Sequence, residues 1–129
     1  MLALDTGIII EIEKGNQNII KKILELRETH PQNMAVTSHT YAEFYFGVVG
    51  REYEKKDIVE KINALEIIIF DKESAKIFAK LRKNMLTRGK QIPLFDLLAA
   101  SSIINTGAIL ITKDNHFKEI PGLNVIFLE

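Results

Sequence analysis

Five short, uninterrupted runs of apolar residues, separated by stretches with helical periodicity, constrain the fold of this 129-residue chain more than any other feature. A run that is apolar at consecutive positions, and not at every second one, is typical of a strand buried on both faces. The five runs cover residues 2–4, 34–37, 67–70, 108–112 and 124–128. We therefore expect a sheet that is covered by helices on both of its faces.

The stretches between these runs repeat their apolar residues with helical spacing. Three apolar helix faces are formed by Ile19, Ile20, Ile23, Leu24 and Leu26, by Ala75, Phe78, Ala79, Leu81 and Leu86, and by Leu97, Leu98 and residues 101–104. Gly89 and Gly107 end two of these helices, and Pro31 follows the third. Strands that alternate with helices predict a parallel α/β sheet. No linker or repeat divides the sequence, which predicts a single domain over residues 1–129.

The composition is that of an ordinary globular protein, with 47% hydrophobic and 26% charged residues. There is no cysteine, which excludes disulfides and thiolate metal sites and fits a reducing compartment. The apolar runs are too short to span a bilayer and Asp5 interrupts the first of them, so we expect a cytoplasmic protein with no membrane contact. The formal net charge is zero, so attraction for nucleic acid would require a local patch or bound cations.

Acidic residues follow several of the predicted strands. Asp5 follows the first run, Asp114 follows the fourth, and Glu43 lies a little over one turn into the helix after the second. Parallel strands end at the same edge of a sheet, so these three side chains are predicted to lie toward one edge. Asp96 stands just after Pro93 at the start of a helix, but the crossover before it contains two predicted helices. The pattern does not determine which end of the sheet Asp96 reaches.

Each acid taken singly has a structural explanation, because Asp at a strand-to-helix junction is usually an N-cap. Residues 40–43 fit a capping box in which Glu43 reaches back to the helix start, and Asp71 is predicted to cap a helix over residues 72–88. The functional prediction depends on the set. Carboxylates that converge at one edge repel one another unless a cation neutralises them, and Mg²⁺ or Mn²⁺ prefers such oxygen ligands. An ion held there can activate water for attack on a phosphodiester.

Four segments together resemble the PIN-domain family, and in particular its VapC toxins. They are LDT at residues 4–6, TSHTYAEFYFG at 37–47, DLLAA at 96–100 and TKDNHF at 112–117, the last followed by IPGL at 120–123. The segments keep the family's order from one end of the chain to the other. The resemblance implies a three-layer PIN-like α/β fold with a five-stranded parallel sheet of order 3-2-1-4-5. In that order Asp5 would lie beside Asp114, and the resemblance also implies that Asp96 turns into the same pocket.

The resemblance also implies an activity, that of a metal-dependent endoribonuclease acting as the toxin of a type II toxin–antitoxin pair. The carboxylates of Asp5, Glu43, Asp96 and Asp114 would bind Mg²⁺ or Mn²⁺ and support cleavage of RNA. Asp5 and Asp96 are expected as direct ligands, while Glu43 and Asp114 ligate directly, act through water, or position the attacking water. Thr6 and Thr112 are expected to orient the carboxylates by hydrogen bonding.

Two protein partners are implied by the same resemblance. One is a second copy of the chain, and the other is a small antitoxin whose C-terminal segment fills the acidic groove and offers an arginine to the carboxylates. The sequence departs from the family at Gly7, where Asn or Ser is usual. This departure leaves open an alternative function, that of a catalytically silent PIN-like module that binds RNA or protein.

Other residues of functional type receive structural interpretations. His30, His39 and His116 lack the spacing of a metal site, and each is expected in a surface or packing role. For His116, which is close to Asp114 in the sequence, contact with substrate is the second possibility. Two basic clusters are expected on solvated faces, with guidance of an RNA backbone as the second possibility: Arg51, Lys55 and Lys56, and Lys80, Arg82, Lys83, Arg88 and Lys90. A receiver domain is disfavoured because it needs an acidic pair at the end of the first strand, where only Asp5 is present. A haloacid-dehalogenase phosphatase is disfavoured because it needs a second Asp two positions after the first, where Gly7 stands.

Overall fold

A five-stranded parallel sheet forms the centre of the computed structural model, which describes all 129 residues. The strands are β1 (Leu2–Leu4), β2 (Met34–Thr37), β3 (Glu66–Ile68), β4 (Ile109–Thr112) and β5 (Asn124–Phe127). They pair in the order β3-β2-β1-β4-β5, and every neighbouring pair is parallel. The sheet order implied by the resemblance is therefore confirmed, and β1 and β4 are neighbours.

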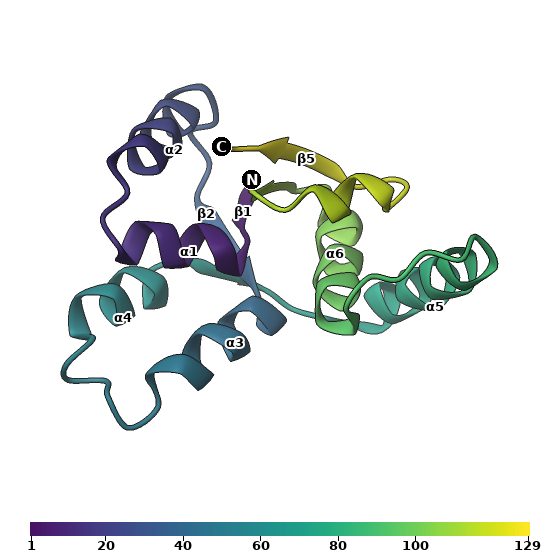
Figure 1. The fold of residues 1–129 in the computed structure, drawn as a ribbon, viewed down its shortest axis with the longest axis horizontal. Helices are drawn as coiled ribbons and strands as arrows, with labels where there is room; N and C mark the ends of the chain where they lie inside the picture. Colours follow the sequence, from purple (N-terminus) through teal and green to yellow (C-terminus); the bar gives the residue numbers. More distant parts are fainter.

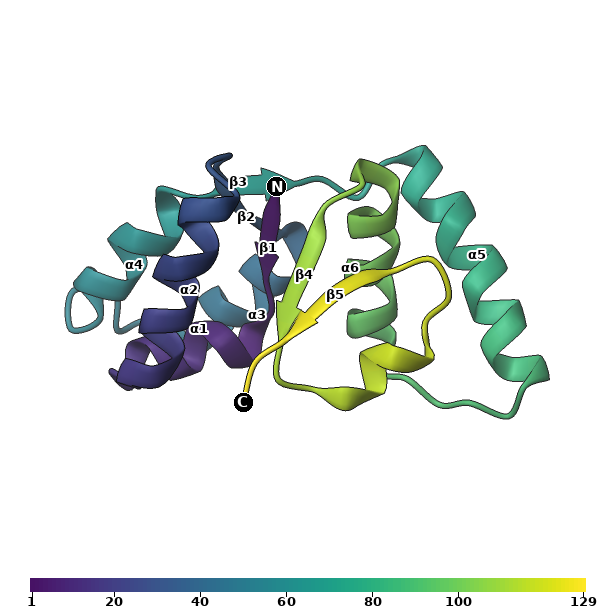
Figure 2. The ribbon, with the colours of Figure 1, turned by 90° about the horizontal axis from the view of Figure 1, so that it is seen from above.

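Six α-helices and one 3₁₀ helix connect the strands. They are α1 (Thr6–Glu13), α2 (Gln17–Thr29), α3 (Ser38–Val48), α4 (Lys56–Asn63), α5 (Lys72–Thr87), α6 (Leu94–Thr106) and the 3₁₀ helix η1 (Asn115–Glu119). Helices α1, α2 and α4 lie on one side of the sheet and α5 and α6 on the other (Figures 1 and 2). Helix α3 contacts both α1 and α6. None of these helices combines the length and the hydropathy needed to cross a bilayer.

Each face of the sheet has its own hydrophobic core. Side chains alternate along a strand, so Leu2 and Leu4 of β1 join the cluster beneath α1, α2 and α4 while Ala3 joins the cluster beneath α5 and α6. The same alternation places Ile111 and Leu110 of β4 in the two different clusters. These residues are all at most 3% exposed. Consecutive apolar residues are needed here because both faces are buried, as the sequence pattern predicts for the central strands.

Helix α6 is surrounded by protein on most of its surface, and this determines where Asp96 lies. Its buried residues include Ala99, Ala100, Ser101 and Ser102, small side chains that allow close approach of the sheet, α3 and α5. Gly107, with φ of 73°, ends the helix and turns the chain back into β4. Helix α6 therefore runs opposite to β4 (Figure 2), and its N-terminal turn lies at the edge where β4 ends.

The predicted third strand is displaced, and its expected burial is wrong. It covers Glu66–Ile68 and not residues 67–70, and only Ile68 is buried. The reason is its position at the edge of the sheet. On one side Glu66 of β3 pairs with Ala35 of β2, and on its other side β3 has no neighbouring strand. Strand β5, at the other edge, has an exposed Asn124 and only partly buried residues after it. Unbroken apolar runs therefore indicated strands correctly but overestimated burial at both edges.

Candidate active site

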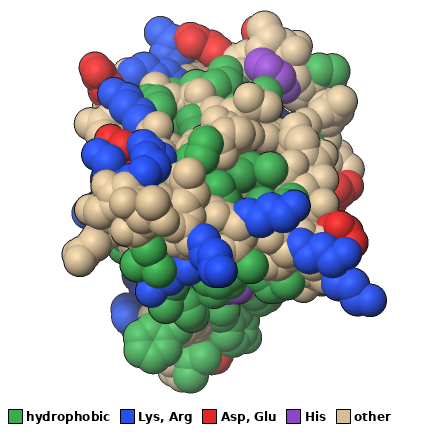
Figure 3. All heavy atoms as spheres, turned by 90° about the vertical axis from the view of Figure 1, so that its right-hand side faces the viewer, with side chains coloured by type: hydrophobic (Ala, Val, Ile, Leu, Met, Phe, Trp, Pro, Cys, Tyr) green, Lys and Arg blue, Asp and Glu red, His purple; other side chains and the backbone are tan.

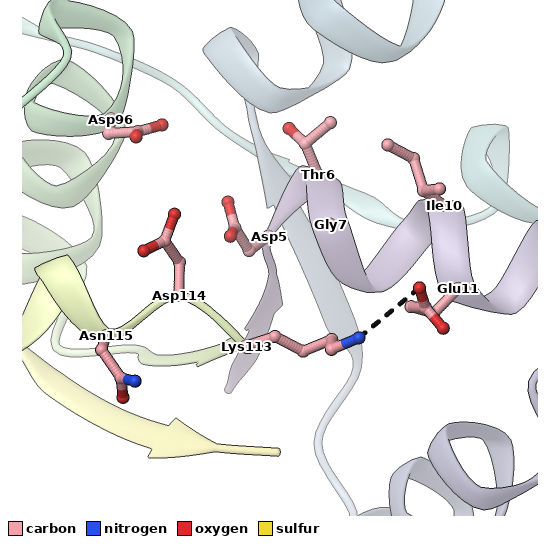
Figure 4. Close-up of a pocket in the computed structure, with 9 residues that line it drawn as sticks. All are labelled: Asp5, Thr6, Gly7, Ile10, Glu11, Asp96, Lys113, Asp114 and Asn115. Atoms are coloured by element: carbon pink, nitrogen blue, oxygen red, sulfur yellow. Dashed lines mark ion pairs between the residues drawn. The ribbon is translucent and has the colours of Figure 1, made fainter. Parts of the chain in front are cut away.

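A pocket of about 610 Å³ opens at the edge of the sheet where β1 and β4 end. It is lined by residues from the first turns of α1, the start of α6 and the segment after β4 (Figure 4). The lining residues are Asp5, Thr6, Gly7, Ile10, Glu11, Asp96, Lys113, Asp114 and Asn115. Three of the four predicted acidic residues therefore line a single pocket, as expected at a switch point of a parallel sheet.

Asp5 is the most enclosed of these carboxylates. It directly follows β1, its backbone N–H donates to the Ile111 carbonyl oxygen (3.0 Å), and its Oδ2 accepts a hydrogen bond from Thr112 Oγ1 (2.7 Å). Its side chain makes no capping hydrogen bond to α1, so the interpretation of Asp5 as a simple N-cap is wrong. Burial raises the pKa of the Asp5 carboxyl above its ordinary value, although the Thr112 hydrogen bond opposes this shift.

Asp96 and Asp114 approach the pocket from α6 and from the start of η1. The pKa of Asp96 is raised by burial and by the nearby charge of Asp5. Asp114 does act as a cap, since its Oδ1 accepts from the His116 backbone N–H at 3.2 Å. The His116 imidazole lies between the two acids, with Nε2 2.9 Å from Asp96 Oδ2 and Nδ1 2.7 Å from Asp114 Oδ1. The expectation of an isolated surface or packing role for His116 is therefore wrong.

Glu43 stands beside this group without lining the pocket. Its Oε1 accepts a hydrogen bond from Thr6 Oγ1 (3.1 Å), and its pKa is raised by burial and by the charges of Asp96 and Asp5. The capping-box alternative for Glu43 is wrong. Helix α3 begins at Ser38, and its cap is Thr37, whose Oγ1 accepts from the Thr40 N–H at 3.0 Å.

Two threonine hydroxyls connect the carboxylates to the sheet and to α1. Thr112 Oγ1 donates to Asp5 and also accepts from the backbone N–H of Asp114 (3.0 Å), so one buried hydroxyl touches both acids. Thr6 Oγ1 makes the corresponding contact with Glu43. The geometry thus gives Thr6 and Thr112 hydrogen bonds of the kind expected for residues that orient ligands.

Four lining residues were not singled out in the sequence. Ile10 and Glu11 follow Thr6 and Gly7 by four positions, so one helical turn brings them to the same face of α1. Lys113 and Asn115 flank Asp114. Lys113 Nζ lies 3.5 Å from Glu11 Oε1 across the pocket (Figure 4). Helical spacing counted from Thr6 and Gly7 would have identified Ile10 and Glu11, whereas the Lys113–Glu11 pair depends on the approach of two separate elements.

The carboxylates share a pocket but do not close around one point. No group of three or more His, Asp or Glu side chains is arranged to hold an ion, and the His116 ring lies between Asp96 and Asp114. The chemistry of the donor set nevertheless fits a hard divalent cation, because it consists of carboxylate oxygens whose mutual repulsion a cation would relieve.

His39 and several residues of the two basic clusters pack against aromatic rings or form ion pairs away from the pocket. The His39 ring packs edge-on against Phe70 and Phe95, with centroid distances of 5.3 and 5.8 Å. In the first basic cluster, Arg51 pairs with Glu54 and Lys55 with Glu13, and in the second, Arg88 and Lys90 both pair with Glu119. On the face to the right of Figure 1, where α5 lies, Lys and Arg side chains are spread among hydrophobic ones (Figure 3).

This sheet order, with carboxylates at the switch point between β1 and β4, defines a class of α/β proteins with an acidic site. A model of the PIN domain matches residues 2–123, and the chain belongs to the PIN-domain family. It is 33% identical over 98 residues to Ribonuclease VapC3 of Methanocaldococcus jannaschii, covering 76% of this chain and 93% of that protein. It is 25% identical over 124 residues to Ribonuclease VapC5 of Mycobacterium tuberculosis, covering 92% of this chain and 87% of that protein.

Solved structures with the same fold include toxin–antitoxin complexes. The chain superposes on a chain of VapBC2 from Rickettsia felis, bound to a DNA fragment from their promoter, with a TM-score of 0.87 and 26% sequence identity. This match covers 99% of the present chain and 98% of the other. The fold of the whole chain is therefore that of VapC-type PIN domains.

Proposed function

We propose that this protein is a divalent-metal-dependent endoribonuclease and the toxin of a type II toxin–antitoxin pair. Its membership of the PIN-domain family and its similarity to proteins named Ribonuclease VapC support the class of activity. The observation that carries the proposal is the convergence of Asp5, Asp96 and Asp114 on one pocket. A protein with no use for these acids would gain stability by separating them, since burial and repulsion disfavour their charged forms.

The proposed roles follow from the position of each side chain. Asp5 and Asp96 would hold Mg²⁺ or Mn²⁺ directly, because both are partly buried and reach the pocket from opposite sides (Figure 4). A bound divalent cation supplies charge neutralisation at the phosphodiester and activation of water. Asp114 and Glu43 would ligate directly or through water, or accept a proton from the attacking water. Thr112 holds Asp5 in place and Thr6 holds Glu43.

The proposal includes two protein partners. The structures that resemble this chain include VapBC complexes, and VapBC2 from Rickettsia felis is one of them. By analogy we propose a cognate antitoxin for this chain, with a basic C-terminal segment that enters the acidic pocket. A homodimer is proposed on the same family resemblance. Size-exclusion chromatography with light scattering tests the homodimer, and the same measurement after co-expression with a candidate antitoxin tests the complex.

The nuclease proposal is tested by cleavage of a mixed single-stranded RNA and tRNA pool with Mn²⁺ or Mg²⁺. We expect wild-type protein to cut and Asp5→Asn and Asp96→Asn to lose at least about a hundredfold in rate, as expected when charged groups aimed at the reacting centre are removed. Asp71→Asn is the matched control, because Asp71 caps α5 outside the pocket and the asparagine oxygen can still accept the capping hydrogen bond. Equal cleavage by all four proteins would contradict the proposed site.

The alternative of a silent binding module is distinguished by melting. Millimolar Mn²⁺ should raise the Tm of the wild-type protein and not that of Asp5→Asn, because a ligand that binds only the folded state stabilises it. A metal-independent Tm combined with no cleavage would favour the binding module.

Gly7 lines the pocket, and no atom lies within 4 Å of the point where a Cβ atom would stand. If the protein is a silent module, the missing side chain at Gly7 would be a lost contact to the metal site.

A further inference from the structure

Two of the four carboxylates of the candidate site accept a hydrogen bond from a threonine, and the other two, Asp96 and Asp114, contact the His116 ring. Thr112 donates to Asp5, and Thr6 donates to Glu43. Asp96 makes no side-chain hydrogen bond of this kind, and the only polar side chain paired with it is that of His116, 2.9 Å away. The contact is close in distance but is not an aligned hydrogen bond, because His116 Nε2 is buried without a hydrogen-bond partner. The imidazole is nevertheless the one polar side chain placed to influence the direction of the Asp96 carboxylate.

His116 is itself held firmly. Its backbone N–H donates to Asp114 Oδ1, its ring Nδ1 lies 2.7 Å from the same atom, and the ring lies 4.5 Å from that of Phe117. Phe117 is 2% exposed and belongs to the core beneath α5 and α6. The buried neighbour and the two contacts with Asp114 restrict rotation of the imidazole, which is 27% exposed.

The imidazole also joins two separate elements. Asp96 lies in the first turn of α6, and His116 lies in η1, after β4. The contact between them is the only side-chain hydrogen bond or ion pair that connects α6 with η1. Without it, the distance between Asp96 and Asp114 would depend on the hydrophobic core that α6 and η1 share through Leu97 and Phe117.

We propose that His116 is a positioning residue that sets the Asp96 and Asp114 carboxylates for metal binding. The inference rests on the proposed function, in which these carboxylates hold a divalent cation. Residues that orient ligands in this way commonly change metal affinity by about 10- to 100-fold when they are replaced. If His116 instead only occupied the place of a cation as a counter-charge, its replacement would strengthen metal binding and not weaken it.

The test is Mn²⁺ binding to metal-free protein at constant pH, followed through the EPR signal of free Mn²⁺. We expect His116→Ala to weaken Mn²⁺ binding by about tenfold. His116→Gln should recover part of this loss, because its amide can donate to Asp96 from near the Nε2 position. His30→Ala is the matched control, since His30 ends α2 away from the pocket, and its affinity should equal that of wild type. Unchanged or tighter binding by His116→Ala overturns the proposal.

A metal-free comparison separates this inference from the proposed function. If wild-type protein binds no Mn²⁺, the proposed function fails, and crystal structures of metal-free wild type and His116→Ala decide the role of His116. Rotation of Asp96 away from the pocket in the variant supports a positioning role. Asp96 and Asp114 side chains in unchanged conformations overturn it.

Discussion

At the scale of single residues, Thr112 contacts two of the acidic residues of the site through its hydroxyl. Its side chain is 0% exposed, donates to Asp5 and accepts from the Asp114 N–H. One small residue at the end of β4 therefore fixes both the carboxylate that follows β1 and the backbone that carries the next acid. Serine or threonine alone among the uncharged small residues provides a donor and an acceptor in one atom.

Replacement of Thr112 by valine tests this dual role, because valine has nearly the same shape and no hydroxyl. The variant should lose about tenfold in RNA cleavage rate, and its free energy of unfolding should fall by about 1–3 kcal/mol because the Asp114 N–H loses its partner. Cleavage assays and urea denaturation measure the two effects. Thr106→Val, at the end of α6, is the control and should leave cleavage unchanged. Wild-type activity in Thr112→Val would show that Asp5 needs no such support.

The pKa directions give a second prediction at this scale. A carboxyl whose pKa is raised in the folded state favours folding only when protonated. Its favourable contribution is present below the unfolded-state pKa and is lost as the pH rises through the folded-state pKa. The pKa of Asp5 is raised chiefly by burial. Asp5→Asn should therefore raise Tm by a few degrees at pH 7 in the absence of metal, and the gain should shrink as the pH falls through the folded-state pKa of Asp5, because protonation removes the charge of the wild-type residue.

Asp71 provides a control of opposite sign for these melting curves. Its pKa is lowered by hydrogen bonds from the Ser74 N–H and hydroxyl, so its ionised form favours the folded state. Asp71→Asn should lower Tm at pH 7, and this difference should shrink as the pH falls. A gain in Tm for Asp5→Asn that is independent of pH would mean that the substitution acts through packing and not through charge.

At the scale of elements, the junction between β2 and α3 shows how one residue ends a strand and starts a helix. Thr37 pairs with Ile68 as the last residue of β2, and its hydroxyl accepts the Thr40 N–H as the cap of α3. Helix α3 carries Glu43 toward Thr6, so its starting point decides the position of that acid. The sequence pattern of residues 40–43 fits a later start equally well, because capping preferences are weak compared with tertiary contacts.

Thr37→Val should lower the free energy of unfolding by about 1 kcal/mol, because valine suits the end of a strand but cannot accept the capping hydrogen bond. Thr37→Ser, which keeps the acceptor, should remain close to the wild type. Urea denaturation of the three proteins provides the comparison. Equal stability of the valine and serine variants would indicate that the hydrogen bond to Thr40 contributes nothing to α3.

At the scale of the whole molecule, the sheet separates two hydrophobic cores, and the candidate site lies where the central strands β1 and β4 end. Ile111 of β4 belongs to one core, while its neighbour Leu110 belongs to the other. The Ile111 carbonyl also accepts the Asp5 N–H, so the centre of the sheet and the site share one backbone contact. Packing defects at this position would therefore affect both the stability of the fold and the position of Asp5.

Ile111→Ala should lower the free energy of unfolding by about 2–5 kcal/mol, as expected for a fully buried aliphatic side chain whose cavity cannot refill. Ile69→Ala is a matched control, because Ile69 is 63% exposed. Its change should stay within about 0.5 kcal/mol, which is usual for surface positions. Chemical denaturation measures both. A loss below about 1 kcal/mol for Ile111→Ala would mean that the surrounding residues close the cavity.

The sequence by itself determined the features that depend on local order along the chain. Continuous apolar runs located the strands, and the positions of Asp5 and Asp114 directly after β1 and β4 placed both at one edge, because parallel strands end together. The strand order came from the resemblance of four segments to a family. Helix α4, with only Ile58 and Ile62 buried, was too short a pattern to be singled out.

Only the tertiary structure decided which separate elements meet. The pattern of the sequence left the position of Asp96 open, and only the family resemblance implied that it enters the pocket. The structure brings the first turn of α6 to the end of β4 and places His116 between Asp96 and Asp114. It also left Ile67 of β3 exposed at the edge of the sheet. The physical reason is that periodicity records how one element is buried, whereas contacts between elements far apart in sequence follow from the packing of two cores against a single sheet.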